Sequence, residues 1–381
     1  MALIDYEKLK EIRRFLHRHP ETSGREEKTA EYIKTELEKT GPDRILTGVG
    51  GYGVIARYLG EEDGPRIMFR AELDGLPIPE TGSRAHRSSE PGKSHACGHD
   101  GHMASLLGVA RYLGSNRPKS GEVCLLFQPA EETGEGALWM LQDPKLNKLQ
   151  FDRGYAFHNL PGFDENLLVW REGAFAAASV GLRIILTGAT SHAGYPHQGR
   201  SPAGAMARFV QYVEAEGRET AGRESFAFST TIYTRLGEEA FGTTPGEAEI
   251  GVTLRASTGE LLSEFRAGVE EKARNLAFEY NLKLDIEELE PFAATINDKA
   301  CLEKVLRGAK QEGFKTKELQ QPFPWSEDFG RFSEVSKIAL VGLGAGRDHP
   351  HLHDSSYDFN DNLIPAAVTL FIQILKEENV I

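Results

Sequence analysis

Hydrophobic residues recur along the chain with spacings that predict helices alternating with short apolar strands. Helices are expected over residues 5–19 and from Ser23 to Gly41, the second opening with a capping box of Ser23 and Glu26. Continuous apolar runs predict strands at 66–71, 122–127, 153–157 and 337–343. Such strands, separated by helices, are typical of a largely parallel sheet covered on both faces. We therefore predict an α/β fold built on a mixed, largely parallel sheet.

The pattern changes in the middle of the chain, from about residue 179. Strands are expected at 180–187, 226–235, 247–256 and 282–289, with helices at 202–216 and 260–280. Their β-α-β-β-α-β order is the split βαβ arrangement of a small ferredoxin-like α+β domain. The α/β pattern then returns. We therefore predict a domain of residues 179–290 inserted into a discontinuous domain of residues 1–178 and 291–381.

The glycine-rich run from Gly48 to Gly53 matches a dinucleotide-binding pattern by letter. A strand-like run, Val54 to Leu59, follows it where a phosphate-binding helix would have to begin. We therefore interpret the run as a hairpin connection and not as a cofactor loop.

Length and composition limit the classes of function. A chain of 381 residues exceeds the roughly 250–300 at which one core stops growing, which favours two domains. A formal charge of −13 disfavours nucleic acid and anionic membranes as partners, because phosphate binding requires a basic face. The first residues lack the basic and apolar regions of a signal peptide, and Cys97, Cys124 and Cys301 lie far apart. We expect a cytoplasmic protein.

The densest group of chemically active residues is the run His95-Ala-Cys-Gly-His-Asp-Gly-His102. Its glycines permit a sharp turn, and thiolate, imidazole and carboxylate ligands together suit a divalent transition metal, with zinc the first choice. Further downstream, Glu131, Glu132, His158 and His353 follow strand ends or lie in loops. In α/β proteins, bound substrates and cofactors lie beyond the carboxyl ends of the strands of the sheet. These residues are therefore candidates for one common site.

Two metal ions fit the number of candidate ligands better than one. A mononuclear catalytic zinc uses three protein ligands, whereas this part of the chain offers five: Cys97, His99, Glu132, His158 and His353. Two ions about 3.5–4 Å apart would use all five. His95 and His102 have weaker claims. Because neighbouring side chains on an extended backbone diverge, one glutamate of the Glu131–Glu132 pair can bind metal while the other faces the reacting water.

Several motifs in order resemble the di-metal amidohydrolases related to aminoacylase and carboxypeptidase. The nearest branch contains hippurate hydrolase, the plant indole-acetyl-amino-acid hydrolases and the aminobenzoyl-glutamate utilisation proteins. The resemblance runs from Arg14 to Asp361 and is carried by the segments 14–21, 71–77, 95–102, 127–132, His158, 191–197 and 352–361.

This resemblance implies an enzyme that hydrolyses the amide bond of N-acyl or N-aroyl amino acids or small peptides. The five candidate ligands would bind two divalent ions, zinc first and otherwise manganese, cobalt or nickel, and Glu131 would be the general base. His192 would reach the active site of a partner subunit and help to hold the oxyanion. The inserted domain would then be the lid and the dimerisation element of a homodimer.

Two departures from the family pattern affect the assignment. Distant relatives have a metal-binding histidine two places before the residue that matches Asp74, where this chain has Glu72. The resemblance implies that His99 takes over this ligand role, and that Asp74 and Asp100 orient the ligands. The residue after His158 is Asn159, which differs from the commoner family residue and affects the wall of the pocket.

Substrate recognition and two alternative functions remain open at this point. Arg255, at the end of a predicted strand, is a candidate clamp for a substrate carboxylate, and Gly344 could offer a backbone N–H group or only turn the chain. One alternative is a metal-free thiol hydrolase that uses Cys97. The other is a non-catalytic relative that binds metal or ligand.

Overall fold

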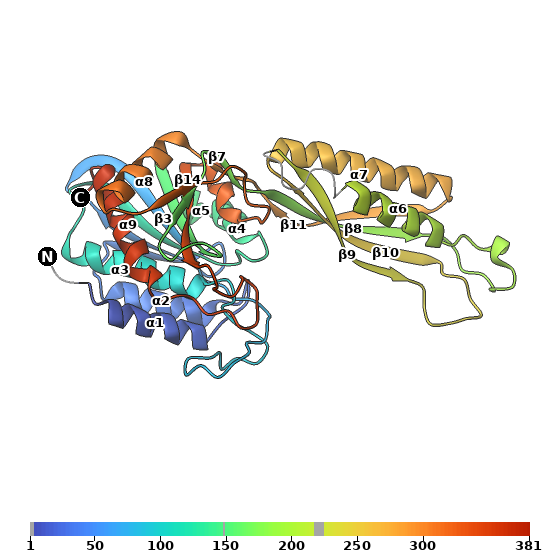
Figure 1. The fold of residues 1–381 in the computed structure, drawn as a ribbon, viewed down its shortest axis with the longest axis horizontal. Coiled ribbons are helices and arrows are strands. Elements are labelled where there is room, and N and C mark those ends of the chain that lie inside the picture. Colours follow the sequence, from blue (N-terminus) through green and yellow to red (C-terminus); the bar gives the residue numbers. More distant parts are fainter. Residues whose placement is uncertain (1–3, 148, 217–224) are drawn as a thin grey trace. The chain divides into compact units, whose positions relative to one another are not determined.

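The protein folds into two compact units. The computed structural model describes residues 4–147, 149–216 and 225–381. Residues of 1–175, 295–319 and 327–381 form the first unit, and residues of 176–294 and 320–326 form the second (Figure 1). The second unit therefore includes residues 320–326, which the sequence pattern placed in the last part of the first domain. Among the described residues, no helix has the length and apolarity that crossing a membrane requires.

An eight-stranded mixed sheet forms the centre of the first unit. Its strand order is β1-β2-β4-β3-β5-β14-β6-β13. The bounds are β1 Arg44–Val49, β2 Gly53–Leu59, β3 Glu62–Glu72, β4 Ser120–Gln128, β5 Arg153–Pro161, β6 Leu168–Trp170, β13 Thr316–Glu318 and β14 Lys337–Gly346. The central strands β4, β3, β5 and β14 are parallel, whereas β1, β2 and β4 pair antiparallel. The predicted mixed sheet is confirmed. The run from Gly48 to Gly53 covers the end of β1, the hairpin connection of residues 50–52 and the first residue of β2.

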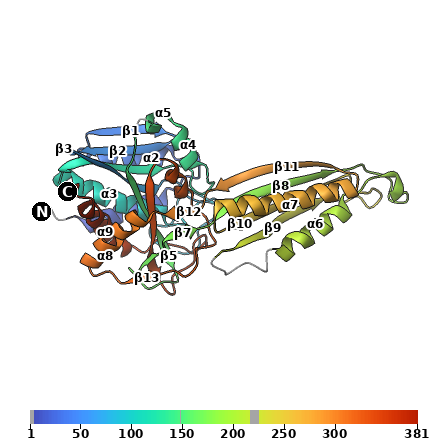
Figure 2. The same cartoon turned by 90° about the horizontal axis from the view of Figure 1, so that it is seen from above.

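Helices cover both faces of this sheet (Figure 2). They are α1 Tyr6–Arg18, α2 Glu27–Glu38, α3 His99–Ser115, α4 Gly136–Gln142, α5 Pro144–Asn147, α8 Lys299–Gln311 and α9 Leu363–Glu377, with the 3₁₀ helix η2 Asp328–Glu334. Phe69 and Leu125 face a core that they share with α1, α2, α3, α8 and α9. Met68 and Leu126, on the opposite face, are also fully buried. Burial on both faces explains why these strands are continuously apolar.

Three expectations about local structure were wrong. Ser23 does not cap α2, because the N-cap is Glu26 and the Ser23 hydroxyl donates to Asp74 Oδ2 at 2.7 Å. His158 lies inside β5 and not beyond its end, since β5 continues to Pro161. Gly344 likewise lies inside β14.

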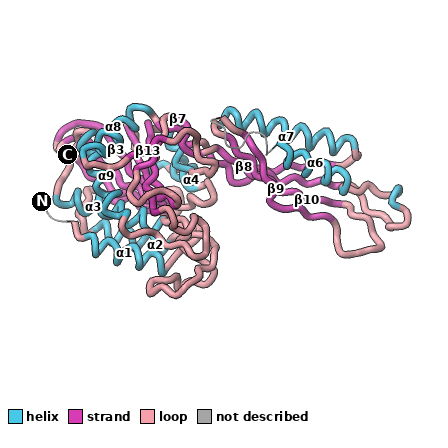
Figure 3. The backbone as a smooth tube through the Cα atoms, viewed as in Figure 1, coloured by secondary structure: helices cyan, strands magenta, loops and turns pink. Residues whose placement is uncertain are grey.

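The second unit is a four-stranded antiparallel sheet covered by two long helices. Its elements are β8 Ala178–Thr187, η1 Pro196–Gln198, α6 Ala203–Glu216, β9 Ala227–Leu236, β10 Glu247–Ala256, α7 Gly259–Glu279 and β11 Lys283–Phe292. The strand order is β11-β8-β10-β9. Figure 3 shows α6 and α7 on one face of this sheet, where Ile184, Ile250 and Phe209 form the core. The short strands β7 (Gly173–Ala176) and β12 (Thr295–Asn297) pair with each other.

Candidate metal centre

Cys97 and His99 lie at the turn that begins α3. Gly98 is the N-cap of this helix and has φ +91°. A Cβ atom at Gly98 would lie 2.6 Å from Asn159 Oδ1, so both the conformation and the space require glycine. His99 Nδ1 donates to the Asp74 carbonyl oxygen at 2.8 Å. This bond fixes the ring and directs Nε2 toward the glutamates.

Glu131 and Glu132 follow β4, beyond a turn at Ala130. Asp74 orients the second glutamate, because its Oδ2 accepts the Glu132 N–H at 3.0 Å. Asp74 therefore contacts both His99 and Glu132, and its role in orienting metal ligands stays a prediction. The His99 Nε2 atom lies 3.6 Å from Glu131 Oε2 and 3.8 Å from Glu132 Oε1. Both carboxylates thus reach the same imidazole.

His158 and His353 approach from two other segments. His158, in β5, places Nε2 at 3.6 Å from Cys97 Sγ. His353 lies in the loop after β14 with φ +65°, and its N–H donates to the Ala96 carbonyl at 2.8 Å. Its Nε2 lies 3.5 Å from Glu132 Oε2. A left-handed histidine of this kind costs free energy, and such strain gathers at functional sites.

The predicted residues meet in overlapping groups, each with ligand atoms within 4.8 Å of one another. Three of the groups consist of predicted site residues alone: Cys97–His99–His158, Cys97–Glu132–His353 and His99–Glu131–Glu132. Their shared members join them into one cluster, which we call the predicted metal centre and define as Cys97, His99, Glu131, Glu132, His158 and His353. The proximity of Cys97, Glu132 and His353, on which the sequence interpretation depended, is present.

The donor atoms of this centre fit divalent cations. Among the described residues, His99 Nε2 and Glu132 Oε1 are buried without a hydrogen-bond partner. Burial, together with the nearby Glu132 and Glu131, raises the pKa of the Cys97 thiol well above its usual value. Burial also raises the pKa of Glu132 to about 7, against the opposing effect of His99. Cations would supply the missing partners and favour the ionised ligands. The same raised pKa disfavours a metal-free thiolate nucleophile.

A buried arginine network adjoins Glu131. Arg70 Nη2 donates to Glu327 Oε1 and to Asp328 Oδ1, each at 2.8 Å, and Nη1 pairs with Glu72. Oxygen atoms of Glu131, Glu327 and Asp328 lie within 4.8 Å of one another. Burial raises the pKa of Glu131 well above its usual value, and the charge of Glu327 raises it further. Sequence reasoning missed this network.

The histidines with weaker claims have different surroundings. His102 Nδ1 donates to Glu72 Oε2 at 2.7 Å, and its Nε2 lies 2.6 Å from Asn159 Oδ1. Asn159 also donates to the Tyr357 hydroxyl. Asn159, where the chain departs from the family pattern, therefore makes polar contacts beside the predicted metal centre. His95 is buried, and neither ring nitrogen has a hydrogen-bond partner among the described residues.

The expectation that Asp100 orients a ligand was wrong. Asp100 Oδ2 accepts a hydrogen bond from His17 Nδ1 at 2.8 Å and lies 3.6 Å from Arg13 Nη1. The physical reason is the helix itself: His99 and Asp100 are consecutive in α3, so their side chains point about 100° apart. Asp100 thus belongs to a separate ionic cluster.

The expected substrate role of Gly344 is also wrong. Its N–H already donates to the Leu167 carbonyl at 2.9 Å, so it is not available to a substrate. A Cβ atom there would lie 2.0 Å from the Asp164 carbonyl oxygen. Glycine at this position allows close backbone packing.

Arg255 and His192 lie in the second unit. Arg255 Nη1 donates to Pro324 O at 3.1 Å and to Ser326 Oγ at 3.0 Å. Burial lowers the pKa of this guanidinium. His192 is exposed in the loop after β8, where its Nδ1 accepts the Gly194 N–H at 3.0 Å. Their roles in catalysis stay predictions.

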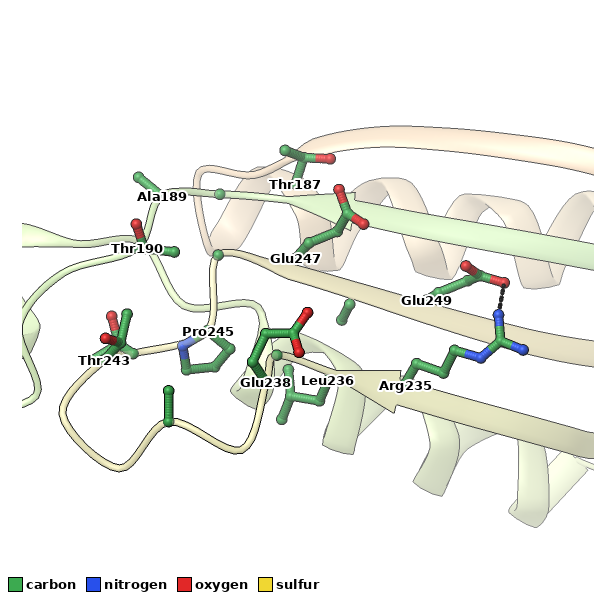
Figure 4. Close-up of a pocket in the computed structure, with 16 residues that line it drawn as sticks. Thr187, Ala189, Thr190, Arg235, Leu236, Glu238, Thr243, Pro245, Glu247 and Glu249 are labelled. Carbon is green, nitrogen blue, oxygen red and sulfur yellow. Dashed lines mark hydrogen bonds and ion pairs between the residues drawn. The ribbon is translucent and has the colours of Figure 1, made fainter.

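A cavity of about 960 Å³ lies at one end of the sheet of the second unit (Figure 4). Arg235 and Glu249 form an ion pair of 3.4 Å on its wall, and Glu238 and Glu247 also line it. None of the predicted site residues lines this cavity. The cavity therefore gives no information about the chemistry of the predicted metal centre.

Comparisons with known proteins identify a family and several relatives. The profile of peptidase family M20/M25/M40 matches residues 68–377. Hippurate hydrolase of Campylobacter jejuni is 28% identical, over 95% of this chain and 94% of that protein. An IAA-amino acid hydrolase of Arabidopsis thaliana is 32% identical, over 96% and 85%. A dinuclear metal-binding peptidase of Bacillus subtilis has a similar structure, with a TM-score of 0.82, 27% identity and coverage of 97% and 96%.

Proposed function

Because this chain belongs to peptidase family M20/M25/M40, we propose that it is a two-metal amidohydrolase that cleaves N-acyl or N-aroyl amino acids or small peptides. The observation that carries the proposal is the meeting of five metal-type ligands beside a sixth, carboxylate side chain. The substrate class is supported by similar proteins that are named hippurate hydrolase, IAA-amino acid hydrolase and N-acetylcysteine deacetylase.

Cys97, His99, Glu132, His158 and His353 would hold the two ions, with zinc or manganese the first candidates. Bound cations lower the pKa of water to about 7 and polarise a carbonyl group. The other tasks fall to side chains of this protein. Asp74 holds the His99 ring and the Glu132 amide in place. The loop conformation at His353 fixes the last ligand.

Glu131 is the general base in this proposal. Its carboxylate accepts a proton from the attacking water and then donates it to the nitrogen of the leaving amino acid. A base works best when its pKa lies near the working pH, and burial and Glu327 both shift Glu131 upward from the ordinary carboxyl value. The role requires that Glu131 does not serve as a permanent metal ligand.

The second unit is assigned to substrate binding and assembly. We assign it the roles of lid and dimerisation domain of a homodimer, with His192 of the partner subunit helping to hold the oxyanion. Arg255 is the candidate clamp for the free carboxylate of the substrate, since the described residues place no acidic side chain in hydrogen-bond contact with it.

Metal analysis followed by a screen of N-acyl amino acids tests the proposal. We expect about two divalent ions per chain, following the two-metal arrangement, and hydrolysis of at least one acyl or aroyl amino acid. Activity that survives in a metal-free preparation but disappears on thiol alkylation would instead support a thiol hydrolase. Metal binding without hydrolysis of any amide would leave the non-catalytic alternative.

A further inference from the structure

The turn that carries the two functional glutamates starts from an unusual backbone conformation. Ala130 has φ +50°. The other described residues with positive φ, apart from glycines, are Asn166, Asn281, Glu290, His353 and Asn379. Asparagine tolerates this region, whereas alanine has a Cβ atom that opposes it. A left-handed alanine persists only where surrounding groups hold it.

A carboxylate from a distant part of the sequence holds this alanine. Glu26 is fully buried at the start of α2, and its Oε1 accepts the Ala130 N–H at 2.8 Å and the Gly24 N–H at 2.9 Å. The turn is closed from the other side by the Gly136 N–H, which donates to the Ala130 carbonyl at 3.0 Å. Both backbone polar groups of Ala130 are therefore bound.

Glu26 and Asp74 together hold alternate amides of the turn. Glu26 accepts the N–H of Ala130, and Asp74 accepts the N–H of Glu132. Glu131 lies between these two fixed points. The backbone that aims the proposed base is thus held by two buried carboxylates, of which sequence reasoning identified only Asp74.

We propose that Glu26 is a positioning residue for hydrolysis: its bond to the left-handed Ala130 aims Glu131 at the reacting water and Glu132 at the metal. This inference rests on the proposed function for the role of Glu131. Loss of the Glu26 carboxylate releases the turn, and Ala130 then relaxes toward right-handed conformations that turn both glutamates away.

A mutant cycle between Glu26 and Ala130 tests this coupling. We expect Glu26→Ala to lower kcat by roughly 10²-fold with little change in KM, because small misplacements of catalytic groups have effects of that size. Cobalt(II) affinity of the metal-free protein should fall by about tenfold, since Glu132 loses its support. Adding Ala130→Gly should recover roughly tenfold in kcat, because glycine removes the cost of the left-handed conformation.

Two further variants separate positioning from general stability. Glu26→Gln keeps an oxygen that can accept both N–H groups, and burial and Asp74 already raise the pKa of Glu26 to about 7, so this variant should behave nearly as the wild type. Glu21→Ala is the matched control, because Glu21 Oε2 accepts the Thr29 N–H in the same helix at 2.8 Å without contacting the turn. It should lower the melting temperature but leave kcat and cobalt affinity unchanged.

The inference is overturned if Glu26→Ala retains wild-type kcat and cobalt affinity, if Ala130→Gly restores neither, or if Glu21→Ala causes an equal loss of both. Failure of the proposed function is a different outcome. In that case the wild type would hydrolyse no amide, and cobalt affinity and its recovery by Ala130→Gly would still decide whether Glu26 holds the turn.

Discussion

Two buried polar clusters begin at consecutive residues of α3 and differ in how their charges are matched. His99 belongs to the predicted metal centre, where His99 Nε2 and Glu132 Oε1 have no hydrogen-bond partner among the described residues. Asp100 belongs to an ionic cluster, which we define as Arg13, His17, Asp100, Asp358 and Asp361. A buried polar group without a partner is costly and requires an explanation. The predicted metal centre contains no arginine or lysine, whereas the ionic cluster contains Arg13, which is paired with Asp358 and Asp361. This difference indicates that the predicted metal centre is built to receive a cation and the ionic cluster to hold the fold.

The ionic cluster contains its own cation, Arg13, although His17 Nε2 has no hydrogen-bond partner among the described residues and lies 3.4 Å from Glu80 Oε1. Arg13 is 1% exposed, and it donates to Asp361 Oδ1 at 2.6 Å, to Asp358 Oδ1 at 2.7 Å and to Phe359 O at 3.0 Å. His17 fills the remaining side of Asp100. These bonds tie α1 to the segment after the His353 loop. The ionic cluster therefore stabilises the backbone next to the predicted metal centre, and it supplies none of the metal ligands.

Removing the metal should have the largest effect and should separate the two clusters. We expect a chelator to abolish amide hydrolysis, because the ligands of the metal centre have no cation to bind, and zinc or manganese to restore it. Thermal unfolding should begin at a lower temperature, because bound metal stabilises only the folded state. Undiminished activity after complete removal, checked by metal analysis, would contradict the assignment of the centre.

Glu131→Gln should have the next largest effect. The amide cannot accept the proton of the water, and loss of a general base lowers kcat by about 10²-fold or more. Metal content should be unchanged, because Glu132 and the other four ligands remain. Steady-state kinetics with metal analysis of the same preparation tests both points, and a variant with wild-type turnover would refute the role of Glu131.

Asp100→Asn tests the ionic cluster in the same way. The change leaves Arg13 and His17 buried beside a neutral amide, and breaking a buried ion pair typically costs about 3–5 kcal/mol. We expect a large loss in the free energy of unfolding, measured with urea. Metal content of the folded protein should stay at the wild-type level. A stability change no larger than that of a surface substitution would show that the cluster is not structural.

The sequence predicted which side chains meet in the candidate site better than it predicted what surrounds them. Thiol, imidazole and carboxylate ligands are recognisable from residue type and from their places near strand ends, as for Cys97, Glu132 and His353. The partner of a buried charge is not recognisable in this way. Arg70 binds Glu327 and Asp328, which lie more than 250 positions away and could be matched only once the sheet was formed. Residue types and local spacing can be read from a sequence, whereas ion pairs between distant residues are known only from the fold.

Two of the errors were avoidable, because helical geometry and residue spacing give the correct result. The direction of Asp100 follows from its position one residue after His99 at the start of α3, because consecutive helical residues do not face one site. The run from Leu363 to Glu377 has apolar residues at helical spacing, and it forms α9, although no helix was predicted there. The fold class was readable from periodicity, but the left-handed turn at Ala130 had no such signal, because alanine does not favour it.

The pH dependence of stability gives the finest test, because the ionic cluster contains a histidine, His17, that is held in its charged form. Burial lowers the pKa of His17, but the charge of Asp100 and its hydrogen bond outweigh burial and raise the pKa to about 9.

The pKa of a histidine in the unfolded chain is about 6.5. Between this pH and the pKa of about 9 in the folded protein, the folded protein binds one more proton than the unfolded protein. The stabilisation is therefore complete below about pH 6.5 and is lost as the pH rises through about 9, with a slope of at most about 1.4 kcal/mol per pH unit. Urea unfolding at several pH values, with the metal kept saturating, measures this slope. His17→Gln should remove it, and an unchanged slope in that variant would assign the titration to another group.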